Sequence, residues 1–192
     1  LGKEDASMRL TLPLKQQNLC LADLCFNVAE QTDSSVMFVA EQGGKQLQVR
    51  YTLRPESYML DMEIASEGME GMTMPGASNL LVEWVARIPQ QEKGADFENR
   101  YSSLTYKRQE KSVKQLSETS DESKKPEEAL EWIAFKNQFF SAVLIGSQPM
   151  TQASLSTTQL PDEKDYLKRY EASFQVPFDA TGKDATHLQM YL

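Results

Sequence analysis

The chain has 192 residues and a formal net charge of −8, because 20 Lys and Arg oppose 28 Asp and Glu. An acidic surface repels phosphate backbones and anionic headgroups, which argues against nucleic-acid binding and against electrostatic docking on membranes. With 40% hydrophobic residues, the chain is too apolar to be disordered as a whole, and we expect one folded domain over residues 1–192.

Apolar and polar residues alternate with a period of two through most of the chain. This pattern is typical of strands with one buried and one solvated face. In chain order, the apolar runs cover residues 8–14, 47–53, 58–65, 80–88, 132–134, 139–145 and 170–176. Gly43-Gly44 predicts a hairpin turn, and residues 50–65 predict a second hairpin. Eight to ten short antiparallel strands with few helices predict an all-β sandwich.

Three polar segments interrupt the alternation. Residues 91–99 are polar and charged and predict one or two helical turns. Residues 109–128 contain ten charged side chains in twenty, too few apolar groups to offset the entropy of ordering, so we expect a mobile charged surface loop. Residues 160–163 predict the start of a short helix.

The small number of reactive side chains excludes much chemistry. A structural zinc site needs about four Cys or His ligands, and Cys20, Cys25 and His187 make three at most. No nucleophile elbow, dinucleotide fingerprint or phosphate-binding loop is present. We therefore predict no catalytic, cofactor-binding or metal-binding residue. On an extended strand Cys20 and Cys25 lie roughly 17 Å apart, which predicts two free thiols.

Three groups of side chains allow a functional and a structural interpretation. A methionine cluster could form an adaptable apolar groove, but filling of a strand and a loop is the favoured interpretation; it comprises Met59, Met62, Met69, Met72 and Met74. An aromatic cluster could line a sugar-binding cleft, but the sandwich core is favoured; it comprises Trp84, Tyr101, Tyr106, Trp132, Phe135, Phe139 and Phe140. Asp61 and Glu63 share one strand face and could act on glycosides, but a solvated face is favoured. His187 is expected to be structural or exposed.

No segment could span a bilayer, because the longest strongly apolar run covers residues 139–145, far short of the roughly 20 residues required. The sequence begins at Leu1 without a Met and ends within an apolar pattern. We therefore expect a fragment of a longer protein. The absence of a membrane-spanning segment in this fragment says little about the rest of that protein.

Two stretches together suggest a family. Residues 87–94, Arg-Ile-Pro-Gln-Gln-Glu-Lys-Gly, lead into a Tyr-rich strand at residues 99–107, and residues 131–145 read Glu-Trp-Ile-Ala-Phe-Lys-Asn-Gln-Phe-Phe-Ser-Ala-Val-Leu-Ile. These stretches resemble the large periplasmic domain of the YidC membrane protein insertases of Gram-negative bacteria. The hairpin at residues 50–65 resembles that family's strand pair, and the long charged loop looks like a Bacteroidetes version.

The resemblance implies an extended antiparallel β-sandwich, a β-supersandwich similar to galactose mutarotase-like folds. It implies a non-catalytic, monomeric periplasmic domain of an inner-membrane insertase, without cofactors. Such a domain assists insertion and folding through contacts with Sec translocon components or nascent membrane proteins. Mutarotases use a His and a carboxylate, and with only His187 available we disfavour an enzyme. The alternative is a carbohydrate-binding module, against which burial of Trp84 and Trp132 would count.

Overall fold

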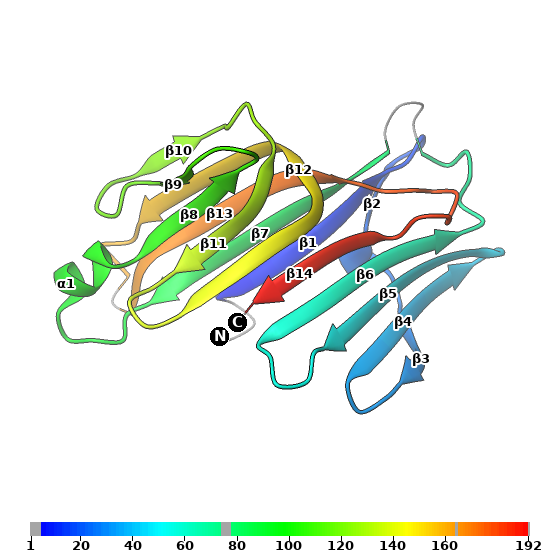
Figure 1. The fold of residues 1–192 in the computed structure, drawn as a ribbon, viewed down its shortest axis with the longest axis horizontal. Helices are drawn as coiled ribbons and strands as arrows, with labels where there is room; N and C mark the ends of the chain where they lie inside the picture. Colours follow the sequence, from blue (N-terminus) through cyan, green and yellow to red (C-terminus); the bar gives the residue numbers. More distant parts are fainter. Residues whose placement is uncertain (1–4, 74–77, 164, 192) are drawn as a thin grey trace.

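The computed structural model describes residues 5–73, 78–163 and 165–191 (Figure 1). Within these residues the chain is almost entirely antiparallel strand, which confirms the all-β prediction. The sheet contains 14 strands, so the expected eight to ten was too low, because several short pairings lack an alternating pattern. The elements are β1 (Ala6–Pro13), β2 (Asn18–Cys20), a 3-10 turn (Leu21–Asp23), β3 (Asn27–Gln31), β4 (Ser35–Gln42), β5 (Lys45–Leu53), β6 (Met59–Glu67), β7 (Asn79–Pro89), α1 (Ala95–Arg100), β8 (Ser103–Arg108), β9 (Val113–Gln115), β10 (Glu122–Lys124), β11 (Leu130–Lys136), β12 (Ser141–Gln159), β13 (Tyr166–Pro177) and β14 (Thr186–Tyr191).

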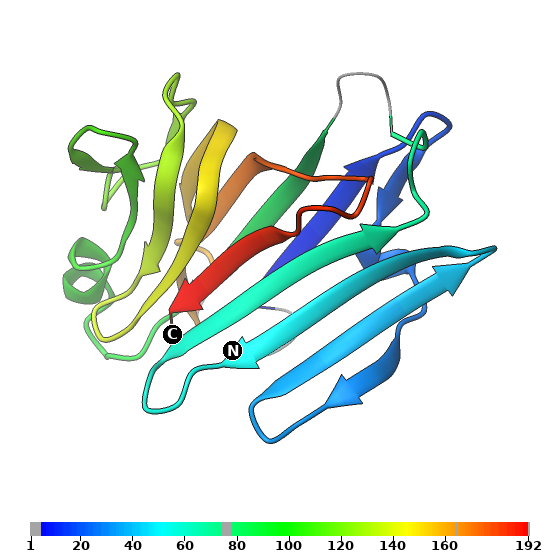
Figure 2. The same ribbon diagram turned by 45° about the vertical axis from the view of Figure 1, so that its right-hand side comes forward.

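The long strand β12 belongs to both layers of a sandwich. Its first half pairs with β11 and β14, and its second half pairs with β13 and β10. One layer therefore runs β2-β1-β7-β13-β12, and the other runs from β12 through β14, β6, β5 and β4 to β3 (Figures 1 and 2). Between the halves, Gln152 has a φ of 50° and the register with β13 shifts. A bulge of this kind bends a strand, which lets one strand serve two sheets.

The core forms between the layers from the apolar positions of the alternating strands. Along β7, for example, Leu80, Val82 and Trp84 are buried while the residues between them are not. Phe135 of β11 bridges the two layers. Its ring stacks on Trp84 with centroids 3.7 Å apart, and it lies 5.3 Å from the ring of Tyr170 on β13. Burial of such rings supplies much of the apolar area removed from water.

The predicted turns are mostly confirmed. Gly43 and Gly44 join β4 to β5 with φ values of 59° and 74°, a left-handed region that glycine enters without steric cost. β5 and β6 form the expected hairpin, and α1 provides the expected helical turns. The helix expected at residues 160–163 is wrong: this stretch is a single turn closed by the Glu163 N–H on the Leu160 carbonyl, because the chain must return at once to pair β13 with β7.

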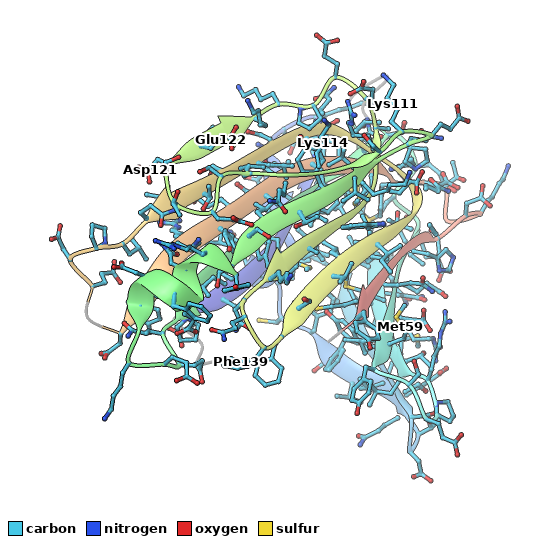
Figure 3. The ribbon with its side chains drawn as sticks, turned by 60° about the vertical axis from the view of Figure 1, so that its left-hand side comes forward. Met59, Lys111, Lys114, Asp121, Glu122 and Phe139 are labelled. Atoms are coloured by element: carbon cyan, nitrogen blue, oxygen red, sulfur yellow. The ribbon has the colours of Figure 1, made fainter. Side chains whose placement is uncertain are left out.

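The charged segment at residues 109–128 contains more structure than its composition predicts. It carries the short strands β9 and β10 beside β8 and β12, respectively (Figure 3). Leu116 is buried, and its N–H donates to the Leu104 carbonyl over 2.9 Å. Glu122 accepts from the Ser117 N–H. A structureless loop over the whole segment is therefore wrong, because a single buried leucine and pairing to neighbouring strands anchor it. The mobility of its remaining residues stays a prediction.

Candidate apolar cleft

An apolar cleft of about 490 Å³ opens between the two layers, at the end of the sandwich where β1 begins and β14 ends. No lining side chain among the described residues is titratable. The cleft is lined by Ala6, Ser7, Met8, Trp84, Ala86, Ile88, Pro89, Gln91, Phe135, Asn137, Phe140, Ala142 and Met190. An enclosure of this kind can hold apolar groups, but its lining offers no titratable side chain that could act as a general acid or base, or activate the Ser7 hydroxyl.

Aromatic side chains form the base and the rim of the apolar cleft. Trp84 is only 5% exposed and stacks on Phe135 with an interplanar angle of 11°. Phe140, in contrast, is 72% exposed at the turn between β11 and β12. The Asn137 side-chain oxygen fixes this turn by accepting from the N–H groups of Phe139 and Phe140 over 2.8 and 2.6 Å. The rim is therefore an apolar group held in place by local hydrogen bonds.

Two fully buried charged side chains, Glu98 and Lys168, hold residues 91–102 in place beside the cleft. Glu98 of α1 accepts from the N–H groups of Gln91 and Glu92 over 2.9 to 3.1 Å. Lys168 of β13 is also fully buried, and it binds three main-chain carbonyls. Its Nζ donates to the carbonyls of Asn99, Ser102 and Glu118 at 3.1, 2.9 and 2.5 Å. Sequence reasoning missed both residues, because charged side chains in a strand or short helix are usually solvated.

The buried Lys168 predicts an alkaline dependence of stability. Burial lowers its pKa from 10.5 to about 8. Between these values the unfolded chain binds more protons than the folded chain, so the free energy of unfolding contributed by this group rises as the pH rises from about 8 to 10.5. Urea unfolding of the wild type and of Lys168→Met across this range isolates the effect, since other groups titrate in both. A difference between the two proteins that stays constant with pH would contradict the prediction.

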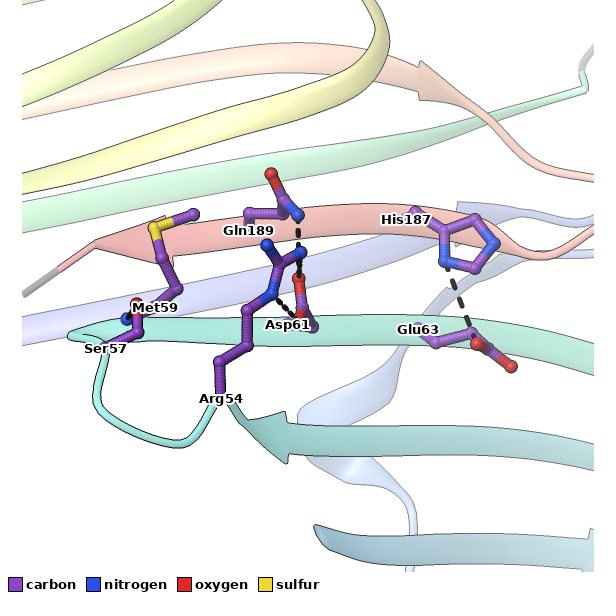
Figure 4. A network of polar contacts seen from close by, with 7 residues as sticks. All are labelled: Arg54, Ser57, Met59, Asp61, Glu63, His187 and Gln189. Atoms are coloured by element: carbon purple, nitrogen blue, oxygen red, sulfur yellow. Dashed lines mark hydrogen bonds and ion pairs between the residues drawn. The ribbon is translucent and has the colours of Figure 1, made fainter. Parts of the chain in front are cut away.

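The structure brings His187 beside Asp61 and Glu63, a link that the sequence did not suggest (Figure 4). His187 Nδ1 lies 3.8 Å from Glu63, and Gln189 donates to Asp61 over 2.8 Å. Arg54 forms two hydrogen bonds of 2.6 and 2.7 Å to Asp61 and holds the pKa of that carboxyl below its usual value. Asp61 thus stays ionised and paired, which does not suit a proton donor near neutral pH.

This polar group lies on the outer face of its layer. Met62 and Ile64 of β6 are buried on the opposite face, which confirms that Asp61 and Glu63 share the solvated side. The side chains of Glu63 and His187 are about half exposed. The expected placement of His187 is therefore confirmed, and the three groups do not line the apolar cleft.

The methionine cluster contributes mainly to packing. Met62 and Met69 are buried in the core, Met59 and Met72 are half-buried, and Met74 lies outside the described residues. This agrees with the favoured structural interpretation of the described members. Cys20 and Cys25 are both free, as expected, with Cys20 buried and Cys25 exposed.

The core interpretation of the aromatic cluster is only partly right. Trp84, Tyr106 and Phe135 are buried, and Trp132 is half-buried. The remaining members are exposed, because they lie at the end of α1 and in the turn between β11 and β12; they are Tyr101, Phe139 and Phe140. The part of the chain that the structure describes contains no helix long and apolar enough to cross a membrane. It also contains no group of three or more His, Cys, Asp or Glu that could hold a metal ion.

The fold places the chain among galactose mutarotase-like β-sandwiches. A galactose mutarotase related enzyme from Lactobacillus acidophilus superimposes with a TM-score of 0.53 and 11% identity, covering 97% of this chain and 82% of the other. A galactose mutarotase-like protein from Lactobacillus casei also gives 0.53, with 13% identity and coverage of 97% and 84%. At such low identity the likeness concerns the fold alone, and it confirms the extended sandwich.

The sequence comparison defines the family more narrowly. Residues 19–192 match the model of the YidC periplasmic domain, and the chain belongs to this family. It is 38% identical over 190 residues to the membrane protein insertase YidC of Phocaeicola vulgatus and 36% identical over 188 residues to that of Bacteroides fragilis. These alignments cover 98% and 97% of this chain but only 31% and 30% of the relatives. The expected Bacteroidetes-type periplasmic domain of an inner-membrane protein is thus confirmed.

Proposed function

We propose that this chain is the non-enzymatic periplasmic part of a membrane protein insertase and that its apolar cleft holds short apolar segments of client proteins. The observation that carries this proposal is the cleft itself, with its Trp84–Phe135 base, its exposed Phe140 rim and its lack of titratable lining groups. Its volume is in the range that encloses a small ligand. It suits a few apolar side chains of an extended segment and not a folded domain.

The chemistry of the client fits this cleft. Segments destined to span a bilayer have about 20 consecutive apolar residues, which are costly to expose to water. A cleft that covers part of such a segment lowers this cost without chemical change. Release is equally simple, because the contacts are non-directional and no charged group must be paired or unpaired.

Site-specific crosslinking in the full-length protein tests the proposal. A photoreactive residue replaces Ala142, which lines the cleft, and in a matched variant it replaces Val113 on the distant strand β9. We expect the Ala142 position to crosslink a ribosome-bound inner-membrane protein once its first spanning segment has emerged, and the Val113 position not to. Equal crosslinking at both positions, or crosslinking of a secreted protein without apolar segments, would refute client binding in the cleft.

A variant that fills the cleft provides the second arm. Ala142→Trp should reduce crosslinking from a photoreactive residue at Phe140 at least about tenfold, if the added ring displaces a group that contributes more than 1.4 kcal/mol to binding. The folded state is checked by urea unfolding, because an added ring can strain its surroundings. Undiminished crosslinking in a folded Ala142→Trp protein would place the client elsewhere.

We also propose that the domain contacts Sec translocon components, and the surface that suits such a contact is strand β3. Its five residues are exposed, and it lies at the end of the strand order, paired with β4. An open strand edge can accept a further strand from another protein. Photoreactive residues on β3 should crosslink Sec components, and such crosslinks from β9 instead would reject this surface.

Neither mutarotase activity nor sugar binding is favoured by the geometry. Asp61 is paired with Arg54, and Trp84 is only 5% exposed and stacked on Phe135, so the Trp84 ring is not free to stack on a pyranose. We expect no acceleration of anomer interconversion in freshly dissolved α-D-galactose, followed by polarimetry. We likewise expect no heat of binding in calorimetric titrations with galactose or glucose. A rate increase that disappears in His187→Ala would establish an enzyme.

A further inference from the structure

We infer that the end of the sandwich where β1 begins and β14 ends docks onto the headgroup region of a zwitterionic lipid bilayer through a set of exposed aromatic side chains. We call this set the aromatic rim. It comprises Tyr58, Phe97, Tyr101, Phe139, Phe140 and Tyr191. The inference goes beyond client binding in the cleft and does not depend on it.

All exposed aromatic side chains of the described residues lie at this one end. Strand register places them there: Tyr191 of β14 pairs with Met59, next to Tyr58, and Val143 of β12 pairs with Tyr191, close to the turn with Phe139 and Phe140. The start of α1 follows β7, whose last residue pairs with Tyr166 near the start of β1. Figures 1 and 2 show the start of β1, the end of β14, α1 and these turns along the same edge of the molecule.

The remaining exposed large apolar side chains give a measure of this bias. Leu53 lies at the same end, beside the β5–β6 turn. Val28 and Val113 lie elsewhere. Val28 is on β3, and Val113 is the first residue of β9 and pairs with Lys107 of β8. The described loops at the opposite end expose no large hydrophobic side chain. The exposed aromatic side chains are therefore concentrated at one end of the strands. They do not reflect a general excess of hydrophobic side chains over the whole described surface.

The aromatic rim consists of three separate groups. Tyr58 and Tyr191 form an edge-on pair with centroids 6.2 Å apart, and Phe97 of α1 lies 4.9 Å from Tyr101, which directly follows this helix. Phe139 and Phe140 form the third group on their fixed turn. A protein partner usually binds one compact cluster of such residues. Separate groups around a rim suit a flat, deformable surface better, and tyrosine and other aromatic rings favour the membrane–water interface.

The charges at this end favour neutral lipid over anionic lipid. Basic and acidic side chains alternate in its loops, with Arg54 beside Glu56, Lys93 beside Glu92, and Arg100 four residues from Asp96. The whole chain carries a net charge of −8. Binding to an anionic surface would need a basic cluster. We therefore expect binding by ring burial, with little dependence on salt.

Flotation with phosphatidylcholine vesicles tests the inference on the chain as printed. The wild type should float with the vesicles, and Tyr58→Ser/Phe140→Ser should bind at least about tenfold more weakly, because the two most exposed rings of the set no longer enter the interface. Val28→Ser/Val113→Ser removes two exposed apolar side chains away from the rim and should change binding less than about twofold. Unchanged urea midpoints establish that both variants fold.

A depth probe supports the same result. A tryptophan in place of Phe140 should be quenched by brominated lipid, and one in place of Val113 should not. Absence of wild-type flotation would overturn the inference, as would equal losses in the rim and control variants. Binding only to anionic vesicles, with loss at high salt, would also overturn it. Self-association of the wild type that Tyr58→Ser/Phe140→Ser abolishes would assign the rim to a second copy of the chain instead.

These outcomes are separable from those of the client-binding test. Ala142→Trp fills the cleft but leaves the aromatic rim in place, so it should float like the wild type. If crosslinking to clients fails and flotation succeeds, the cleft proposal is wrong and the rim assignment stands. The reverse pair of results rejects the rim alone.

Discussion

Replacing Lys168 by Met is expected to lower the free energy of unfolding by about 2 kcal/mol or more. The fully buried Nζ satisfies the carbonyls of Asn99, Ser102 and Glu118. Methionine fills similar space but donates no hydrogen bond. The Asn99 carbonyl keeps the Ser102 N–H as a donor, so the carbonyls of Ser102 and Glu118 lose their partner, and each such loss costs about 1–3 kcal/mol. Urea unfolding at pH 7 measures the loss.

Lys114→Met is the matched control, because Lys114 lies exposed on β9 (Figure 3). It should change stability by less than about 0.5 kcal/mol. Hydrogen exchange adds a local readout: the amides of residues 97–102 should lose protection in Lys168→Met, because two of the three carbonyl partners lie there. A loss below about 1 kcal/mol would mean that water replaces the ammonium group as donor.

Phe135→Ala is expected to destabilise the protein by about 3–5 kcal/mol, the usual range for removing a buried phenylalanine. The Phe135 ring packs against Trp84 of β7 and Tyr170 of β13, which belong to the same layer. Phe135 itself is on β11, which pairs with the half of β12 that belongs to the other layer. Its removal therefore leaves a cavity at the contact between the layers, where collapse would require movement of whole sheets. It also removes the base of the apolar cleft.

Phe140→Ala provides the control, since it deletes the same side chain from the exposed rim. Its effect on stability should stay within about 0.5 kcal/mol. The two variants should thus separate packing from the proposed client binding: we expect Phe135→Ala to affect both and Phe140→Ala to affect only the proposed binding. Similar unfolding midpoints for the two proteins would show that Phe135 is not part of a tightly packed core.

The local pattern of the sequence predicts much of the fold, and the resemblance adds its architecture. Period-two alternation identifies β5, β6, β7 and β13 because each strand has one buried face. Strand neighbours were beyond this reasoning: β1 pairs with β7 and β14 with β6, across long separations that no local pattern encodes. The bend at Gln152 was missed for the same reason, since β12 had been expected only as far as residue 145.

The candidate site was harder to predict than the fold. A cleft depends on how two layers separate at one end, and alternation says nothing about that distance. Phe139 and Phe140 follow an apolar strand and precede another, so they were assigned to the core, although both lie in the turn between them. Glu98 and Lys168 have ordinary surface chemistry, and only the closed chain shows that main-chain groups surround them.

The position of β14 has a consequence for the order of synthesis. This strand lies between β12 and β6, so it joins two parts of the sheet made long before it. Until Thr186–Tyr191 have been translated, β6 and the first half of β12 each have an open edge, a hazard for pairing with other chains. Folding of the β3–β6 meander onto the rest therefore waits for β14. If translation stops before β14 has been made, the resulting chain cannot close the sandwich.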